Sequence, residues 1–452
     1  MNESKIIKIW TVITKIFLIG LLIQFFVQTF VTYRLEGTGI IRSLIRMWKE
    51  IILIGIAGFL VRFLTKRKIR EARRKTNPIR KFILRFGITV LVMLVVSIII
   101  NQSGIGITIM SLRYSMIGFA IFIIFFALSY LFFGTREINI TKRYARVIKT
   151  LLVASVCRRG IIWLTPNVLT HFGYNQFNYE GDIGIAPPVA YYTQFDSGYV
   201  RNQFLFERPI SRWFFLIAFW PLFFLLCMKK KPRQEKALWW GLYGIALLST
   251  FSRAAWIAWI VQIIILILLQ MQRKHRKIAI YSFLPLLVLF SWVTYVGRNQ
   301  IINRDFSNNG HLKMIISAAE KVIEQPFFWR GAGFAGPASH YLAQGQAYNP
   351  ENQYLQIWLE YGIFWFAWRM YLYIRLHLIG RKAYKLEQDD KKKIVKKTRE
   401  YGILIFGLSL GLLGLSIEWF VLHSFVDRMI VYPFMAVFGL TYALYLKSLN
   451  TK

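Results

Sequence analysis

Long apolar runs, each about the length of a membrane-spanning helix, recur from one end of the sequence to the other. Hydrophobic residues fill 56% of the 452 positions, close to what twelve spans of about 20 apolar residues would use. A single run would equally fit a buried core helix, but too many recur for that explanation to be general. The sequence therefore predicts an all-α, polytopic integral membrane protein of about 12 transmembrane helices, with residues 1–452 forming one membrane-embedded domain.

Basic residues between the apolar runs predict how the chain crosses the membrane. The formal net charge is +37, which by itself would fit a nucleic-acid partner, anionic lipid or the positive-inside rule. Most of the charge lies in short clusters that we assign to the cytoplasm: residues 62–85, 136–149, 229–236, 273–277 and 375–399. This distribution favours membrane lipids and no nucleic acid as partners, with both termini cytoplasmic.

The alternation of clusters and runs defines the predicted spans. They are residues 10–32, 44–64, 82–100, 115–134, 150–169, 212–228, 237–251, 254–271, 278–296, 354–374, 402–422 and 426–446. Cys157 and Cys227 both fall inside spans and belong to no metal-ligand spacing. We therefore expect no disulfide framework, no metal site and no cofactor.

Two segments on the non-cytoplasmic face are long enough to carry function. Residues 170–211 are rich in Tyr and Phe, a composition suited to sugar faces or to the membrane interface. Residues 297–353 begin with an amphipathic helix, Leu312–Gln325, that Pro326 ends. A glycine-rich stretch, Gly331–Pro337, follows it. We expect these two loops to hold the chemistry.

A polar break, Ser249–Ala255, interrupts about 35 otherwise apolar residues, too many for one span. It predicts a tight outer turn that holds Arg253 at the membrane surface. Arg253 is either a snorkelling interfacial arginine or part of a phosphate or diphosphate site, because its guanidinium donates paired hydrogen bonds. Arg201 and Arg208, late in the first outer loop, are further candidates for the diphosphate, or else solvated loop charges.

Two arginines, Arg158 and Arg159, lie inside the fifth predicted span, where each costs about 2.5–3.5 kcal/mol on insertion scales. Such a cost implies a partner. Glu50 of the second span is the candidate for a structural ion pair. Contact with a lipid-borne phosphate is the functional alternative.

Seven titratable side chains on the outer face are candidates for a general base: His311, His340, Glu351, Glu360, Glu418, His423 and Asp427. Glu351 stands out because it precedes a span among Asn352, Gln353 and Tyr354, where partial burial would raise its pKa toward a useful value. An acid at this place would equally favour the helix by its interaction with the dipole.

Three stretches together resemble the bacterial O-antigen ligase and polysaccharide polymerase superfamily. They are the Ser249–Ala255 turn, the segment from Gly310 through Gln325-Pro326 to Gly331–Gly333, and Glu351–Gln356 followed by Glu360-Tyr361-Gly362. The three stretches follow one another in the order usual for the family, and all are predicted to lie on the outer face. The resemblance covers residues 200–430. The chain departs from the ligases at Glu351, where they usually carry histidine, and this departure leaves His311 and His340 as alternative bases.

The resemblance implies an inverting, metal-independent glycosyltransferase of the bacterial cytoplasmic membrane. Its donor would be a polyprenyl-diphosphate-linked oligosaccharide and its acceptor a glycan hydroxyl. Arg253, supported by Arg201, would stabilise the leaving diphosphate, Glu351 or a loop histidine would take the acceptor proton, and Tyr354 and Gln356 would bind the glycan. A polymerase of surface or capsular polysaccharide is the leading hypothesis. A glycan ligase is the close alternative, and a lipid-linked-sugar transporter or flippase, which Arg158 and Arg159 would suit, is the competing class.

Overall fold

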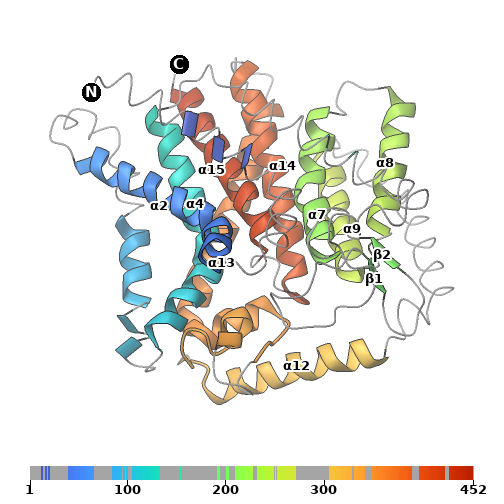
Figure 1. Cartoon of the computed structure of the whole chain (residues 1–452). Helices are drawn as coiled ribbons and strands as arrows, with labels where there is room; N and C mark the ends of the chain where they lie inside the picture. The colour runs from blue at the N-terminus through green and yellow to red at the C-terminus, as the bar shows by residue number, and fades with distance from the viewer. Residues whose placement is uncertain are drawn as a thin grey trace.

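A computed structural model describes most of the chain as packed helices (Figure 1). The described residues are 39–65, 104–132, 191–193, 200–202, 209–227, 232–248, 252–270, 305–327, 330–341, 348–388, 396–422 and 427–450, with parts of 12–20 and 84–99 and a few isolated positions. The helices are α2 (Gly39–Thr65), α4 (Ile105–Phe132), α7 (Pro209–Cys227), α8 (Arg233–Leu248), α9 (Arg253–Gln270), α12 (Asp305–Glu324), α13 (Gln353–Gln388), α14 (Lys396–Glu418) and α15 (Arg428–Asn450). A 3-10 helix, η4, covers Gly336–Tyr341.

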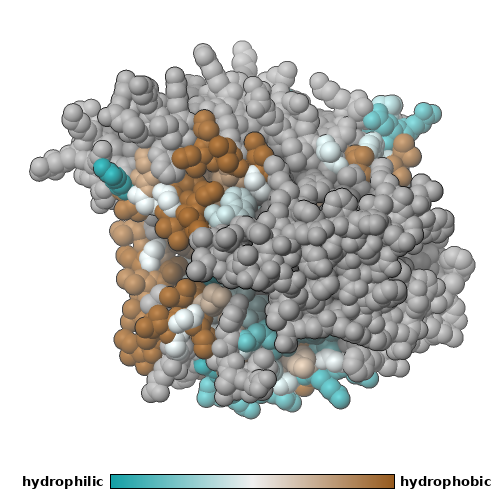
Figure 2. Space-filling view, viewed as in Figure 1, coloured by the Kyte–Doolittle hydropathy of each residue, from teal (hydrophilic) through white to brown (hydrophobic). Residues whose placement is uncertain are grey.

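Three of these helices are long and apolar enough to cross a membrane: Ile105–Leu131 within α4, Thr398–Glu418 within α14 and Ile430–Leu449 within α15. Shorter apolar helices lie at Leu84–Met93, Trp213–Leu225 and Arg253–Leu269. Large hydrophobic side chains remain exposed along α2 and residues 84–99, and hydrophobic atoms gather on that side of the surface (Figure 2). A helical integral membrane protein is thus confirmed, whereas the number of twelve spans stays a prediction.

Two helices differ in extent from the predicted spans. α4 begins at Ile105, ten residues before the predicted start at 115, because Ser111, Arg113 and Ser115 find buried polar partners instead of water. α13 runs on to Gln388, past the predicted end at 374 and into the basic cluster. Within the predicted first outer loop, β1 (Tyr191–Thr193) and β2 (Val200–Asn202) form an antiparallel pair, a small exception to the all-α prediction.

The core is centred on α14, which packs against α7, α9, α13 and α15. Small residues allow this close approach, as is usual between membrane helices. A Cβ atom on Gly411 would lie 2.1 Å from the carbonyl oxygen of Ala218, and one on Gly414 would lie 2.2 Å from Nε2 of Gln262. That Gln262 amide donates to the carbonyl oxygens of Ile217 and Leu410, so one buried side chain ties α7, α9 and α14 together.

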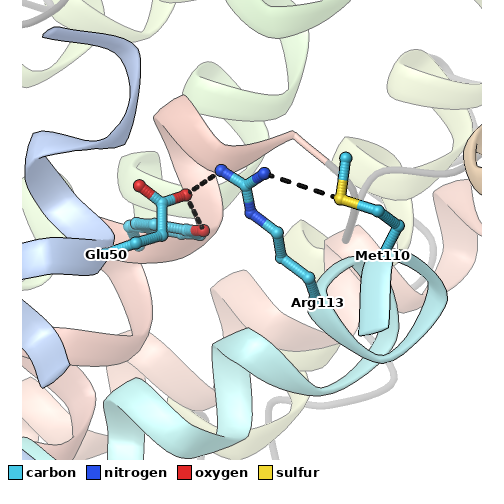
Figure 3. A network of polar contacts seen from close by, with 4 residues as sticks. Glu50, Met110 and Arg113 are labelled. Carbon is cyan, nitrogen blue, oxygen red and sulfur yellow. Dashed lines mark hydrogen bonds and ion pairs between the residues drawn. The ribbon is translucent and has the colours of Figure 1, made fainter. Parts of the chain in front are cut away.

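Glu50 forms the buried ion pair that holds α2 against its neighbours (Figure 3). Its Oε1 atom accepts from the guanidinium of Arg113 on α4 and from the hydroxyl of Tyr432 on α15, at 3.1 Å from the latter. The structure thus pairs Glu50 with Arg113. The predicted pair of Glu50 with Arg158 or Arg159 stays a prediction, because both arginines lie outside the described residues.

Candidate functional site

The first turn of α13 is built by the residues that follow Glu351. Asn352 caps the helix, because its Oδ1 atom accepts from the backbone N–H of Leu355 at 3.0 Å. Glu351 itself adopts a left-handed backbone conformation, with φ of 50°, which is uncommon for a residue other than glycine. The capping bond therefore belongs to Asn352, and the Glu351 side chain is directed elsewhere.

The same turn of α13 is bonded to the end of α14. Asn352 Nδ2 donates to the carbonyl oxygen of Phe420 at 3.1 Å, and the N–H of Gln353 donates to that of Trp419 at 2.9 Å. The Tyr354 hydroxyl donates to the carbonyl oxygen of Ser416 at 2.7 Å. These three bonds satisfy carbonyls that the end of a helix would otherwise leave without partners. They place the start of α13 level with the end of α14.

One turn further on, Glu360 anchors the glycine-rich stretch. Its fully buried carboxylate accepts from the N–H of Gly333 at 2.9 Å, from Ser111 Oγ of α4 at 2.8 Å and from Gln356 Nε2 at 3.0 Å. Tyr361 contacts Ser111 and Ser115 on the same face of α4. A single buried acid thus joins α13, α4 and the stretch around Gly333.

Positive φ angles at three of its glycines, Gly331, Gly333 and Gly336, shape this stretch. A Cβ atom on Gly333 would lie 2.1 Å from the Ile107 side chain, and one on Gly336 would lie 2.2 Å from Gln356 Nε2. A larger residue at either position would therefore be strained. The stretch lies against α12, where Ala335 packs with Ala318 and Val322.

Tyr348 closes the second outer loop onto the same structure. Its carbonyl oxygen accepts from the N–H of Gly336 at 2.8 Å, and its own N–H donates to Ser339 Oγ at 3.0 Å. Burial raises the pKa of the Tyr348 phenol, whose hydroxyl lies 3.4 Å from Ser317 Oγ on α12. Tyr348 therefore holds the chain just before Glu351 against both η4 and α12.

The structure brings two of the candidate bases, His311 and Glu351, into contact. Nδ1 of His311, on α12, lies against Oε2 of Glu351. The two side chains are 29% and 30% exposed. The two residues come from opposite ends of the second outer loop. An imidazole in contact with a carboxylate, both partly exposed, has the composition of a general-base pair.

The other candidate bases differ in burial. His340 is exposed on η4, and Asp427 is partly exposed before α15. Glu360 and Glu418 are fully buried, and among the described residues neither Glu418 oxygen has a hydrogen-bond partner. A bulky acceptor does not reach a fully buried carboxyl, so exposure favours Glu351, His311 and His340. His423 lies outside the described residues.

The candidate glycan-binding residues are engaged in the scaffold. Gln356 is buried and its amide is held by Glu360. Tyr354 is partly buried, with its hydroxyl on Ser416 and its ring 4.8 Å from that of Phe420. Both residues are held in the scaffold, since Gln356 Nε2 donates to Glu360 and the Tyr354 hydroxyl donates to the carbonyl oxygen of Ser416.

Arg253 begins α9, directly after a tight turn from α8. Ser252 Oγ accepts from the N–H of Ala255 at 3.3 Å and caps the helix, while the Leu247 carbonyl accepts from Thr250 and from the Trp256 indole. Arg253 is therefore a partly buried cation at the positive end of a helix dipole. Arg201 pairs with Tyr192 in the β1–β2 ladder. Arg208, Arg158 and Arg159 lie outside the described residues.

Ser111 and Ser115 on α4 are the site residues that sequence reasoning missed. Their spacing of four residues within an apolar helix puts both on one face, which was the available signal. In the part of the chain that the structure describes, no three His, Cys, Asp or Glu side chains gather as metal ligands would.

Comparison with known families agrees with this geometry. Residues 237–367 match a family model described as O-antigen ligase. The matched stretch runs from α8 into α13 and contains Arg253, His311 and Glu351. No curated protein matches the chain significantly. The match confirms the resemblance to that superfamily over residues 237–367 and supports a glycan-processing function.

Proposed function

We propose that this chain, as a member of the O-antigen ligase superfamily, polymerises a surface or capsular polysaccharide from polyprenyl-diphosphate-linked repeat units. The observation that carries the proposal is the contact between His311 and Glu351. Of the two acids in the Glu351–Glu360 motif, Glu351 is partly exposed and Glu360 is buried. The contact joins Glu351 to a histidine that lies 40 positions earlier in the sequence. The other polar residues of that motif hold the scaffold, so Glu351 is the residue left for chemistry.

The reaction follows from the properties of this pair. The acceptor hydroxyl loses its proton to the His311–Glu351 pair while its oxygen attacks the anomeric carbon of the donor sugar. The new carbon–oxygen bond forms as the bond to the diphosphate oxygen breaks, and attack from the opposite side inverts the anomeric configuration. The positive φ of Glu351 supports this role, because a strained backbone at a non-glycine residue is commonly found at functional sites.

Arg253 is our candidate for stabilising the diphosphate that leaves. Its guanidinium and the N-terminus of α9 add two favourable interactions with an anion. Arg201 and Arg208 would assist from the first outer loop. Negative charge grows on the leaving oxygen as the bond breaks, so a fixed cation at this position accelerates the step.

A glycan ligase is the second candidate, because the matched family is described as O-antigen ligase. Glu351, in place of the histidine usual in those ligases, argues for the polymerase. The deciding experiment incubates the purified chain with a lipid-linked repeat unit. Longer lipid-linked chains support the polymerase and transfer to a different acceptor supports the ligase. Absence of any new glycosidic bond contradicts both and favours transport.

A further inference from the structure

The amphipathic helix α12 carries an exposed apolar stripe that no part of the site uses. Leu312, Ile316 and Ile323 are 56%, 47% and 76% exposed. At 3.6 residues per turn they lie within about 40° of one another around the helix. Phe327, just beyond the helix, is exposed as well. Scattered apolar residues are normal on a surface, but three aligned on one helix form a face.

This stripe is separate from the face that packs on the protein. Ala318 and Val322 are buried against Ala335 and Leu359, about 120° around the helix from the stripe. Charged residues, among them Lys313, Glu320 and Glu324, occupy a third face about 80° from the stripe on its other side. A helix with one face on protein, one apolar and one charged is the pattern of a helix that lies in a membrane interface.

The contacts of α12 with α13 fix its place at one end of the long helices. The N–H of Gln353, at the start of α13, donates to Trp419, next to the end of the candidate span Thr398–Glu418. Leu359 lies six residues further along α13, before the break that Gly362 makes in that helix with its φ of 75°. Because Val322 packs on Leu359, the C-terminal half of α12 is held near the end of that candidate span.

Two hydrogen bonds fasten the end of α12 to α13. The Trp358 indole donates to the carbonyl oxygen of Pro326 at 2.8 Å, and the N–H of Arg330 donates to that of Leu359 at 2.8 Å. A tryptophan with its ring on apolar neighbours and its N–H bonded is typical of the membrane–water boundary. α12 runs across the long helices at one end of the molecule (Figure 1).

We infer that α12 lies in the outer leaflet of the bilayer and that Leu312, Ile316 and Ile323 face the acyl chains just below the headgroups. His311 precedes Leu312, so this placement sets the His311–Glu351 pair at the depth of the headgroups. A lipid-linked diphosphate carries its reacting sugar at the same depth. This last consequence rests on the proposed function, whereas the placement of α12 does not.

The test measures the depth of single side chains in the full-length protein. Cys157→Ala and Cys227→Ala remove the native thiols, and Leu312→Cys or Ile316→Cys is labelled with an environment-sensitive fluorophore. Lys313→Cys is the matched control on the charged face. Each variant is reconstituted in vesicles of phosphatidylethanolamine and phosphatidylglycerol and quenched by nitroxide-bearing lipids or by aqueous iodide.

We expect lipid nitroxides to quench the label at 312 or 316 about threefold more than at 313, and iodide to show the reverse order. Equal quenching of all sites by iodide would place α12 in water and overturn the inference. Protection of 312 and 316 from both quenchers would show that protein covers the stripe and would overturn it equally. Neither readout depends on enzymatic activity, so the result stands apart from the proposed reaction.

Discussion

The imidazole of His311 lies against the carboxylate of Glu351, which pairs the helix at the start of the second outer loop with the residue that ends it. Neither residue has a fixed place without the scaffold around it. Glu360 holds the glycine-rich stretch, that stretch supports α12, and Asn352 to Tyr354 bind the end of α14. The predictions below test the pair, its scaffold and the membrane core separately.

Replacing Glu351 by glutamine removes the proposed proton acceptor and keeps the shape of the side chain. We expect chain elongation by the purified protein to fall about 10²–10⁴-fold, the usual contribution of a general base. His311→Ala should cause a similar loss, and the double variant should be little worse than either single one. Glu320→Gln is the control, because it changes an exposed acid on α12, the helix that carries His311. Elongation by Glu351→Gln within a few fold of the unmodified protein would contradict the assigned role.

Arg253→Ala should shorten the surface glycan in the native host at normal protein levels. Loss of a charge that stabilises the leaving group costs about 10²–10³-fold in kcat. Arg253→Lys should recover part of the rate only, because lysine keeps the charge and lacks the planar fork. Arg381→Ala, an exposed arginine late in α13, controls for loss of charge. Normal chain lengths for Arg253→Ala would exclude the diphosphate role.

Gly336→Ala should destabilise the protein by about 2 kcal/mol or more, because the residue has a positive φ and the added Cβ meets Gln356. Gly310→Ala is the matched control. Its Cβ would meet no atom within 4 Å, and alanine in a helix is favoured by about 1 kcal/mol. Thermal unfolding in detergent should therefore shift in opposite directions for the two variants. A shift in the same direction for both would refute this account of the stretch.

Glu360→Ala leaves the N–H of Gly333 and the side chains of Ser111 and Gln356 without their shared acceptor. Each buried donor left unsatisfied costs about 1–3 kcal/mol, so a large fall in the unfolding temperature is expected. Glu324→Ala removes an exposed acid whose partner is Arg330, and it should change stability by less than about 1 kcal/mol. Unfolding of both variants at the same temperature would show that Glu360 does not hold the glycine-rich stretch in place.

Arg113→Gln breaks the buried ion pair with Glu50 and should destabilise the helix bundle by about 3–5 kcal/mol, since it leaves a carboxylate without its charged partner. Adding Glu50→Gln removes that charge and should recover most of the lost stability. Unfolding of the single and double variants in detergent measures the difference. Additive losses would show that the two residues do not act as a pair.

The sequence by itself determined the class of protein and the side of the membrane on which we sought the site. Apolar runs predicted a helical membrane protein, and the turn before Arg253 was correctly placed between two helices. The motifs around Gly331, Glu351 and Glu360 pointed to the family that residues 237–367 match. These features are local: hydropathy, turn composition and residue order are all readable within a short window.

Only the tertiary structure decided which motif residues are scaffold and which are open to chemistry. Gln356 and Tyr354 suited a glycan by residue type, yet the amide nitrogen of Gln356 is bonded to Glu360 and the hydroxyl of Tyr354 to Ser416. α4 begins ten residues early because Ser111 and Arg113 find partners on α13 and α2. The pairing of His311 with Glu351 depends on how the second outer loop folds back. A polar side chain's role is set by its partners, and residues distant in sequence become partners only when the helices pack.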